Sequence, residues 1–283
     1  MTTFGDQVFQ YGGVAVSSGP QVPFTTGKTF FVSSGTGSNG NSGRKPSEAV
    51  ATLDWAVGLC TASKYDVIVL MPGHAESVAT AGAIALDVAG ISIVGLGTGS
   101  LRPTFTMITN ATATITVAAS NMSITNCLFI GGVAACATVF DNANAVVAND
   151  FTIDNCEFKD SSTTLNIVRC FRSGTTANQA DGFTFTRNKV TSIMGTPTAG
   201  TTCALSAAAQ ARFTLTDNVV VRTNAIATAF ATLLAMGANA HTQMIVARNR
   251  TATPDTDVGI GAMLSGGSTT SSGHVYDNYS WHL

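Results

Sequence analysis

The sequence predicts an all-β protein, a parallel β-helix of about eight coils in which a helix caps the first coil. Three observations predict this fold: an eight-residue motif that recurs along the chain, an alternation of apolar and polar residues inside each copy, and a second set of strand-like segments between the copies. A repeat of this length indicates supersecondary units that stack on one another and bury a shared core.

The motif is clearest at Phe213–Val220, which reads Phe-Thr-Leu-Thr-Asp-Asn-Val-Val. Its sixth position forms a column with steps of 29, 32, 30, 31 and 29 residues: Cys127, Cys156, Asn188, Asn218, Asn249 and Asn278. Stacked parallel strands lie about 4.8 Å apart, a distance that an amide-to-amide hydrogen bond can span. We therefore expect these six residues to form a structural ladder. A free cysteine behaves as a small hydrophobe, so Cys127 and Cys156 in this column favour a buried position.

Charged residues precede the ladder in several copies of the motif. The preceding column reads Asn126, Asn155, Arg187, Asp217, Arg248 and Asp277. If this column faces solvent, arginine and aspartate alternate in sign along the stack, as an exposed ladder should. We interpret these charges as a solvated face and not as a binding site.

Further strands and a helix complete the expected fold. The second strand set comprises Thr138–Phe140, Ile167–Phe171, Cys203–Leu205, Thr232–Met236 and Gly261–Leu264. Counting back from Cys127 by 31 residues gives Leu96 and then Tyr65, which extends the repeat into the first half of the chain. Residues 46–62 are predicted to form a helix, because Pro46 and Glu48 suit a first turn. Such a helix would cover the open strand edges of the first coil.

Two regions follow from this pattern: an extended arm over residues 1–27 and a β-helix over residues 28–283. The arm has no sustained period, yet it carries apolar side chains without a core of their own. We expect these side chains to contact a partner protein: Phe4, Phe9, Tyr11 and Val14.

Composition limits the classes of partner. Charged residues make up 11% of the chain, against roughly 25% in ordinary globular proteins. The formal net charge of −2 gives no reason to expect a nucleic-acid partner, since phosphate binding needs clustered lysine and arginine. No apolar run is long enough to predict a membrane span, and no secretory signal is visible at the start. A surface this poor in charge suggests self-association or another assembly.

A family resemblance rests on the first part of the chain. A strand at Lys28–Ser33, a loop of glycine, serine and asparagine at Ser34–Gly43, the expected helix and the buried strand Asp66–Gly73 follow in this order. This order resembles the opening of the pectate-lyase-like superfamily and, more narrowly, the β-helix proteins of tailed bacteriophages. The resemblance implies a right-handed β-helix over about residues 28–283. The first fourteen residues also resemble the N-terminal arms of phage head-associated proteins.

The superfamily contains enzymes, so the acidic residues need inspection. Pectate lyases of this fold hold Ca²⁺ with stacked carboxylates, and calcium needs six to eight oxygen ligands. Glycosidases need two carboxyl groups about 5–9.5 Å apart. The acid-rich part of the chain consists of Asp150, Asp154, Glu157, Asp160 and Asp181. Their spacing puts them on different faces of one strand and its turn, so we expect no catalytic pair, no metal site and no cofactor.

The histidines have no ligand spacing. His74 follows Pro72-Gly73 and precedes Glu76, which favours a turn-stabilising contact between the two side chains over a general base. His241 and His274 precede strands of the repeat and have no partner at metal-ligand spacing. The six cysteines form no CxxC pair, so we expect reduced core thiols.

Two function classes remain open. The resemblance implies a non-enzymatic virion protein, a decoration (cement) protein that binds the major capsid protein through residues 1–27. It would form a homo-oligomer, expected to be a trimer, on the capsid exterior after assembly in the bacterial cytoplasm. The alternative is a short tailspike or tail fibre that binds or cleaves host surface polysaccharide. Tailspikes of this fold are typically longer and carry a separate trimerisation domain, which favours the first class.

Overall fold

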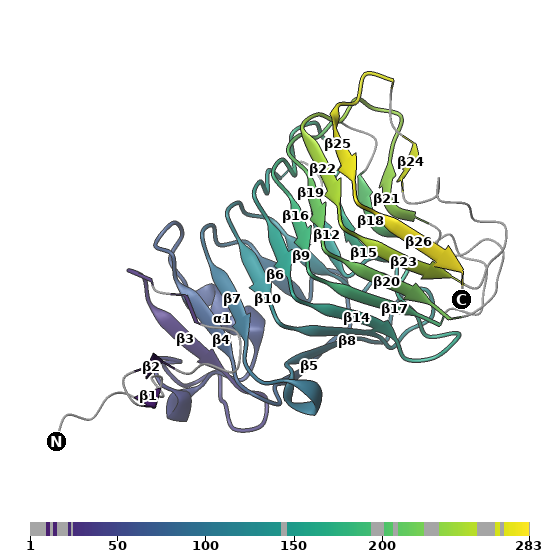
Figure 1. The fold of residues 1–283 in the computed structure, drawn as a ribbon. Helices are drawn as coiled ribbons and strands as arrows, with labels where there is room; N and C mark the ends of the chain where they lie inside the picture. Colours follow the sequence, from purple (N-terminus) through teal and green to yellow (C-terminus); the bar gives the residue numbers. More distant parts are fainter. Residues whose placement is uncertain are drawn as a thin grey trace.

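The computed structural model is a parallel β-helix with three long sheets (Figure 1). It describes residues 10–11, 14–15, 22–23, 25–142, 146–193, 201–205, 209–223, 232–253, 264–266 and 269–282. The expected fold class is confirmed. Coils with a strand in all three sheets are slightly fewer than the eight predicted, because the first and last coils of the described chain are incomplete.

Each sheet takes one strand from each successive coil, and all pairings within the three sheets are parallel. Sheet 1 consists of β3 (Thr29–Val32), β4 (Val67–Leu70), β7 (Ser92–Gly95), β10 (Ser123–Thr125), β13 (Thr152–Asp154), β16 (Thr184–Thr186), β19 (Thr214–Thr216), β22 (Met244–Ala247) and β25 (Gly273–Tyr276). Sheet 2 consists of β5 (Ala75–Val78), β8 (Thr104–Met107), β11 (Leu128–Gly131), β14 (Glu157–Asp160), β17 (Lys189–Ser192), β20 (Val219–Arg222), β23 (Arg250–Thr253) and β26 (Tyr279–His282). Sheet 3 consists of β6 (Ile84–Leu86), β9 (Ile115–Val117), β12 (Phe140–Asn142), β15 (Arg169–Arg172), β18 (Thr201–Leu205), β21 (Thr232–Met236) and β24 (Leu264–Gly266).

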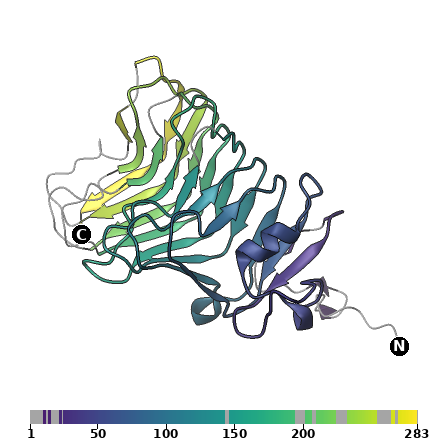
Figure 2. The same ribbon diagram turned by 180° about the vertical axis from the view of Figure 1, so that it is seen from behind.

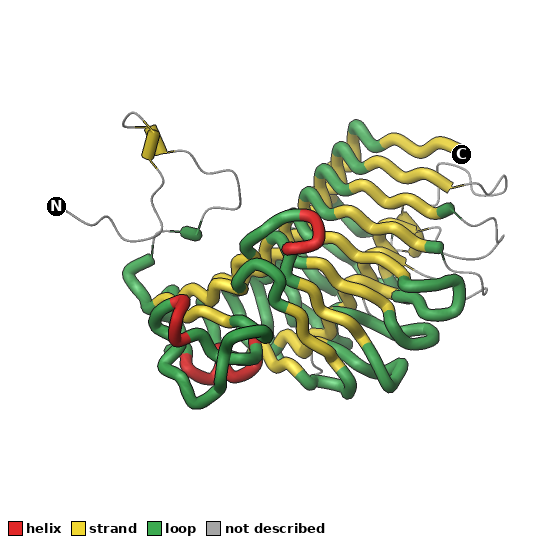
Figure 3. Tube along the Cα trace, turned by 90° about the horizontal axis from the view of Figure 1, so that it is seen from below, coloured by secondary structure: helices red, strands yellow, loops and turns green. Residues whose placement is uncertain are grey.

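Each copy of the motif spans the corner between sheets 1 and 2, and the aligned corners are visible along the stack in Figure 3. The residue before the ladder column turns the chain in the left-handed conformation, with φ between 49° and 60° in all six copies. This conformation costs an L-residue about 1–2 kcal/mol, and asparagine and aspartate tolerate it best. Arg187 and Arg248 therefore need support from their surroundings at this position.

The ladder residues supply that support from one coil to the next. The Oδ1 atom of Asn188 accepts a hydrogen bond from the backbone N–H of Cys156 at 2.8 Å, and Asn218 accepts from Asn188 at 2.9 Å. The same bond joins Asn249 to Asn218 at 3.1 Å and Asn278 to Asn249 at 3.0 Å. Each ladder residue thus holds the turn of the coil before it.

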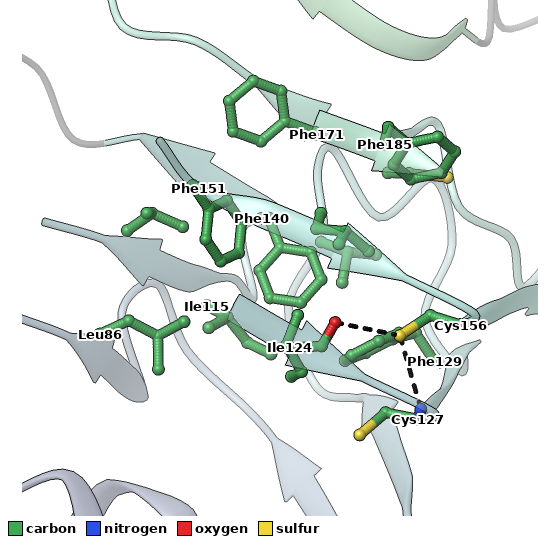
Figure 4. Packing of buried hydrophobic residues seen from close by; sticks show 14 of the residues in the cluster. Leu86, Ile115, Ile124, Cys127, Phe129, Phe140, Phe151, Cys156, Phe171 and Phe185 are labelled. Carbon is green, nitrogen blue, oxygen red and sulfur yellow. Dashed lines mark hydrogen bonds between the residues drawn. The ribbon is translucent and has the colours of Figure 1, made fainter. Parts of the chain in front are cut away.

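The other end of each amide fixes the neighbouring strand. The Nδ2 atoms of Asn188, Asn218 and Asn249 each donate to a carbonyl in the preceding strand of sheet 1 at 2.9 Å. Cys156 takes the same place with a weaker acceptor, since its Sγ receives the N–H of Cys127 at 3.4 Å (Figure 4). The column is buried from Cys127 to Asn249.

Phenylalanine fills the interior between the sheets. Phe105, Phe129 and Phe158 stack on successive coils with ring centroids 5.5 and 5.0 Å apart. Phe140 of sheet 3 meets Phe129 edge-on at 4.9 Å, and Figure 4 shows the two rings side by side in the core. Rings in such contact stabilise by about 0.5–1.5 kcal/mol beyond their area burial.

The six cysteines are free, and five of them are fully buried. Burial raises the pKa of the Cys136 thiol to about 11 and that of Cys60 to about 12. Thiolates are the reactive form, so these side chains act as packing groups.

The predicted continuous helix over 46–62 is wrong. A 3₁₀ turn, η1 (Pro46–Glu48), is separated from α1 (Leu53–Leu59) by extended chain. Val50 donates its N–H to the carbonyl of Phe31 and accepts the N–H of Ser33, both at 2.9 Å. These bonds pair the segment with the outer edge of β3, and Thr52 then caps α1 by accepting from the N–H of Trp55.

Together these pieces close the first coil. Leu53, Ala56 and Val57 of α1 are buried against the common core. Figure 2 shows the helix lying against the first strands at this end of the stack. No helix in the described chain is both long and apolar enough to cross a membrane.

The arm has one described piece of regular structure. β1 (Gln10–Tyr11) and β2 (Val14–Ala15) form an antiparallel two-stranded sheet that is separate from the other three. Tyr11 and Val14 are register partners in it, whereas Phe4 and Phe9 lie outside the described residues.

Replacing Asn218 with Leu should lower the free energy of unfolding by about 1–3 kcal/mol, because the N–H of Asn188 and the carbonyl of Phe185 lose their buried partner. Urea unfolding followed by circular dichroism measures the change. Thr214→Ala, on the outer face of the same repeat, is the matched control, with an expected change within about 0.5 kcal/mol. Equal losses in the two variants would contradict the role of the ladder.

Candidate functional site

The outer face of sheet 1 carries hydroxyl groups in register. The first outward position of successive strands is Ser92, Ser123, Thr152, Thr184 and Thr214. Thr186 and Thr216, at the second outward position, contact each other through their hydroxyls at 3.0 Å. Apart from Thr216, which is buried, these side chains are half-buried, so this part of the sheet presents a polar surface.

The same face is apolar at the first coils. Phe31, Val67, Val69 and Val94 form a small outer cluster, and Val22 packs against it. The hydroxyl of Thr25 also donates to the carbonyl of Tyr65, and the N–H of Lys28 donates to Asp66 Oδ1 at 2.6 Å. The end of the arm is therefore fixed across sheet 1.

A groove of about 380 Å³ lies where the apolar and polar parts of this face meet. It is lined by Pro23, Ser92, Val94, Ser123, Thr125, Asp154, Asn155 and Arg187. The arm thus forms one wall and sheet 1 forms the floor.

Asp154 and Arg187 carry the charges of this groove. Asp154 Oδ2 lies 2.6 Å from Arg187 Nη2, and the Asp154 side chain is 14% exposed. Its other oxygen, Oδ1, is buried without a hydrogen-bond partner in the described chain. The groove therefore offers hydroxyls and one guanidinium to a polar ligand, and Asp154 Oδ2 holds that guanidinium in place.

The five acids of the acid-rich segment lie on different faces, as expected. Asp154 faces the groove, whereas Glu157 lies on sheet 2 between Arg102 and Lys189. Asp160 points inward and accepts from the N–H of Ile167 at 2.8 Å and from the hydroxyl of Ser192 at 2.9 Å. The remaining two lie at turns: Asp150 pairs with Arg212, and Asp181 accepts from the N–H of Ala211.

Among the described residues no group of three or more histidine, cysteine, aspartate or glutamate side chains is placed to hold a metal ion.

The turn column does not face solvent throughout: Asn126 is buried, and its Nδ2 donates to the carbonyls of Gly95 and Gly97. The charged members of the column lie at the surface, where three of them form ion pairs. Arg248 meets Asp217 through two hydrogen bonds of 2.7 Å, and these bonds lower the pKa of the Asp217 carboxyl. Arg187 pairs with Asp154, one position outside the column, and not with Asp217. Half-exposed pairs of this kind contribute little to stability, which agrees with a solvated face.

His74 and Glu76 form a contact that fixes the first turn. His74 Nδ1 accepts the N–H of Ser34 at 3.1 Å, so the ring proton is on Nε2, which faces Glu76 Oε2 at 3.2 Å. Glu76 also accepts the N–H of Leu53 at 2.9 Å. The pair joins the glycine-rich loop and the start of α1 to the first coil.

His241 belongs to a second buried ladder. Its Nδ1 accepts the N–H of Gln210 at 3.2 Å, and Gln210 Oε1 accepts the N–H of Ala180 at 2.9 Å. Burial lowers the pKa of His241. Sequence reasoning missed this ladder because its members differ in type, although they share the spacing of about 30 residues.

Sequence reasoning also missed the groove. Arg187 and Asp154 were both noted, but their contact depends on the side-chain direction at the corner. The available signal was the serine or threonine at the first position of five consecutive strands of sheet 1. Pro23 carried no signal in the sequence.

No family description and no curated protein sequence matches this chain. Among solved structures, a rhamnogalacturonan lyase is similar with a TM-score of 0.41 and 14% identity over 88% of this chain. The chain spans 62% of the length of that lyase. A GH136 lacto-N-biosidase from Eubacterium ramulus is similar with a TM-score of 0.40 and 9% identity, over 90% of this chain and 68% of that one. Similarity this low constrains neither the activity nor the ligand of this chain.

The lowered pKa of His241 predicts a pH dependence of stability. The unfolded chain binds a proton near pH 6.5 and the folded chain only at lower pH, so stability is lost as the pH falls below about 6.5. His241→Gln keeps an acceptor on the ladder but cannot titrate. Between pH 7.5 and 5.5 the melting temperature of this variant should fall less than that of the wild type. Equal falls would show that His241 is not the group responsible.

Proposed function

We propose that this protein is a non-enzymatic structural protein of a tailed-bacteriophage virion, which decorates the exterior of the head and stabilises the shell. In this proposal the arm of residues 1–27 anchors the protein: residues 1–21 bind the major capsid protein, and Val22 and Thr25 attach the arm to the β-helix, which is the body that it holds in place. The chain would assemble in the bacterial cytoplasm and form a homo-oligomer, which we propose to be a trimer.

One observation carries the proposal: the β1–β2 ribbon pairs with none of the three sheets, whereas the segment that follows it is fixed to the first coil. An isolated two-stranded ribbon is at best marginally stable in water, so it requires a partner surface. Val22 packs against sheet 1, and the hydrogen bonds of Thr25 and Lys28 join the same segment to the first coil, so the residues that follow the ribbon are fixed to the β-helix. A structural anchor needs this combination of a separate contact segment and a fixed base.

The body supports the same function. The ladder and the phenylalanine core repeat along the stack, so neighbouring coils stabilise one another along the β-helix. The low share of charged residues, 11%, is consistent with a surface that is partly covered in an assembly.

Deletion of residues 1–21 tests the anchor and leaves Val22 in place. The truncated protein should keep its circular dichroism and oligomer mass but fail to co-sediment with phage heads that lack the protein. A second variant, with Tyr11→Ser and Val14→Ser in the full-length chain, keeps the arm and should weaken co-sedimentation less than the deletion does. Full decoration by the truncated protein would contradict anchoring through the arm.

The groove on sheet 1 favours a second candidate, a short tailspike or tail fibre that binds host surface polysaccharide. Its hydroxyls, Asp154 and Arg187 match the hydrogen-bonding groups of a sugar chain. Copy number separates the candidates: hundreds of copies per particle indicate a head protein, and a few tens or fewer indicate a tail protein.

We expect no lyase or hydrolase activity, because Asp154 is paired with Arg187 and the other acids lie on other faces. Incubation with polygalacturonate or with bacterial capsular polysaccharide should release no reducing ends and no unsaturated products. Release that is lost in Asp154→Ala would overturn this expectation and assign the groove a catalytic role.

A further inference from the structure

The outer face of sheet 2 differs in kind from that of sheet 1. The outward hydroxyls of sheet 1 run from β7 to β19 and are followed by Ile245 on β22, whereas sheet 2 carries aliphatic and basic side chains beside the hydroxyls of Thr104, Thr106 and Thr191. The half-exposed aliphatic residues are Leu128, Ile130, Val219 and Val221, and Tyr279 on the last strand is 60% exposed. In the register of the sheet they lie on β11, β20 and β26, on either side of the charged strands.

The charges on this face are mostly positive. Lys159, Lys189 and Arg250 project outward from β14, β17 and β23, and Arg102 reaches the face from the turn before β8. The carboxylate among them is Glu157, which Arg102 meets at 3.3 Å and Lys189 at 3.4 Å. Within the described part of the chain, Lys159 and Arg250 have no carboxylate partner. In the described chain the outer face of the sheet 2 strands therefore carries three cations and one carboxylate, and the turns before them add Arg102, Arg187 and Arg248 against Asp217 and Asp277, although the chain as a whole carries a net charge of −2.

We infer that the outer face of sheet 2 is a docking surface for a protein partner whose own surface is acidic and partly apolar. The inference deepens the proposed function, on which it rests: the arm anchors the protein, and this face is the side of the body that lies on the shell protein. The excess of cations predicts that the contacting surface of the partner carries negative charge. Complementary charge steers association and fixes orientation more than it adds affinity.

The aliphatic residues select a protein over the other polyanions. A nucleic acid or an anionic lipid headgroup offers phosphates to lysine and arginine but nothing to rows of leucine, isoleucine and valine on a flat sheet. Protein interfaces combine apolar and charged contacts, and on this face the aliphatic strands β11 and β20 flank the charged strands β14 and β17. Glu157 holds Arg102 and Lys189 in place, so part of the basic surface is ordered before a partner binds.

The test measures binding of full-length protein to a fluorescent peptide of alternating glutamate and valine. A peptide of about ten residues spans about seven strands at their spacing of about 4.8 Å. The comparison probes are the same peptide with lysine for glutamate, a short DNA duplex, and vesicles that contain anionic phospholipid. The wild type should bind the glutamate peptide most tightly, and more weakly at high salt.

Lys189→Glu/Arg250→Glu should weaken binding of the glutamate peptide by about tenfold or more. Lys45→Glu/Lys64→Glu makes the same change of charge at exposed positions near α1 and should bind as the wild type does. Because Lys189→Glu places two carboxylates together, Lys189→Gln/Arg250→Gln is measured in parallel and should show a smaller loss with unchanged melting temperature. Equal binding by the face and control variants, or tighter binding of DNA or vesicles, overturns the inference.

Co-sedimentation of the same variants with phage heads connects the two proposals. If the protein is absent from virions but the peptide results hold, the virion function fails and the docking surface stands. If truncation of the arm abolishes decoration while the glutamate variants decorate normally and bind the peptide normally, the docking surface fails and the virion function stands.

Discussion

The hydrogen bond between a ladder side chain and the turn of the preceding coil is the interaction on which the rest of the structure depends. At the corner a residue adopts the left-handed conformation, which is unfavourable for arginine, as at Arg187 and Arg248. The ladder residue of the next coil fixes that corner, because its side-chain oxygen accepts the backbone N–H of the residue that follows the corner. Asn218 does this for Asn188. Without these bonds a backbone donor would be left unpaired at each coil from Cys127 to Asn249, at about 1–3 kcal/mol each.

Because the corners are fixed from inside, the outer faces of the sheets are free to differ. Sheet 1 presents registered hydroxyls and the groove with Asp154 and Arg187, whereas sheet 2 presents aliphatic side chains and cations. Ion pairs at the exposed corners, such as that of Arg248 with Asp217, contribute less to the stability of the fold than the buried ladder bonds do. This separation between a fixed interior and variable outer faces explains how one repeat can position two surfaces of different chemistry. It also explains why the arm can cross sheet 1 at the first coils, where Val69 and Val94 replace the hydroxyls.

Features that repeat could be predicted from the sequence, and features that occur once could not. The column from Cys127 to Asn278 was visible because each copy obeys the same constraint, and the strands on either side follow from its alternation. The helix over 46–62 was wrong because Val50 pairs with β3, a contact that local propensity does not encode. The floor of the groove was signalled by serine or threonine at the first position of successive strands of sheet 1, but its wall comes from the arm and could not be predicted. The pairing of Glu157 with Arg102 joins residues 55 positions apart, so the repeat spacing gave no signal for it.

Hydrogen exchange at the ladder tests the central claim most directly. The backbone N–H groups of Cys156, Asn188, Asn218 and Asn249 are the donors that the ladder satisfies. The account predicts that these four amides exchange with solvent only at the rate of global unfolding, although they lie next to exposed turns. Exchange at the rate of the surrounding turn residues would show that the corners open locally, and the ladder would then not be what holds the coils together.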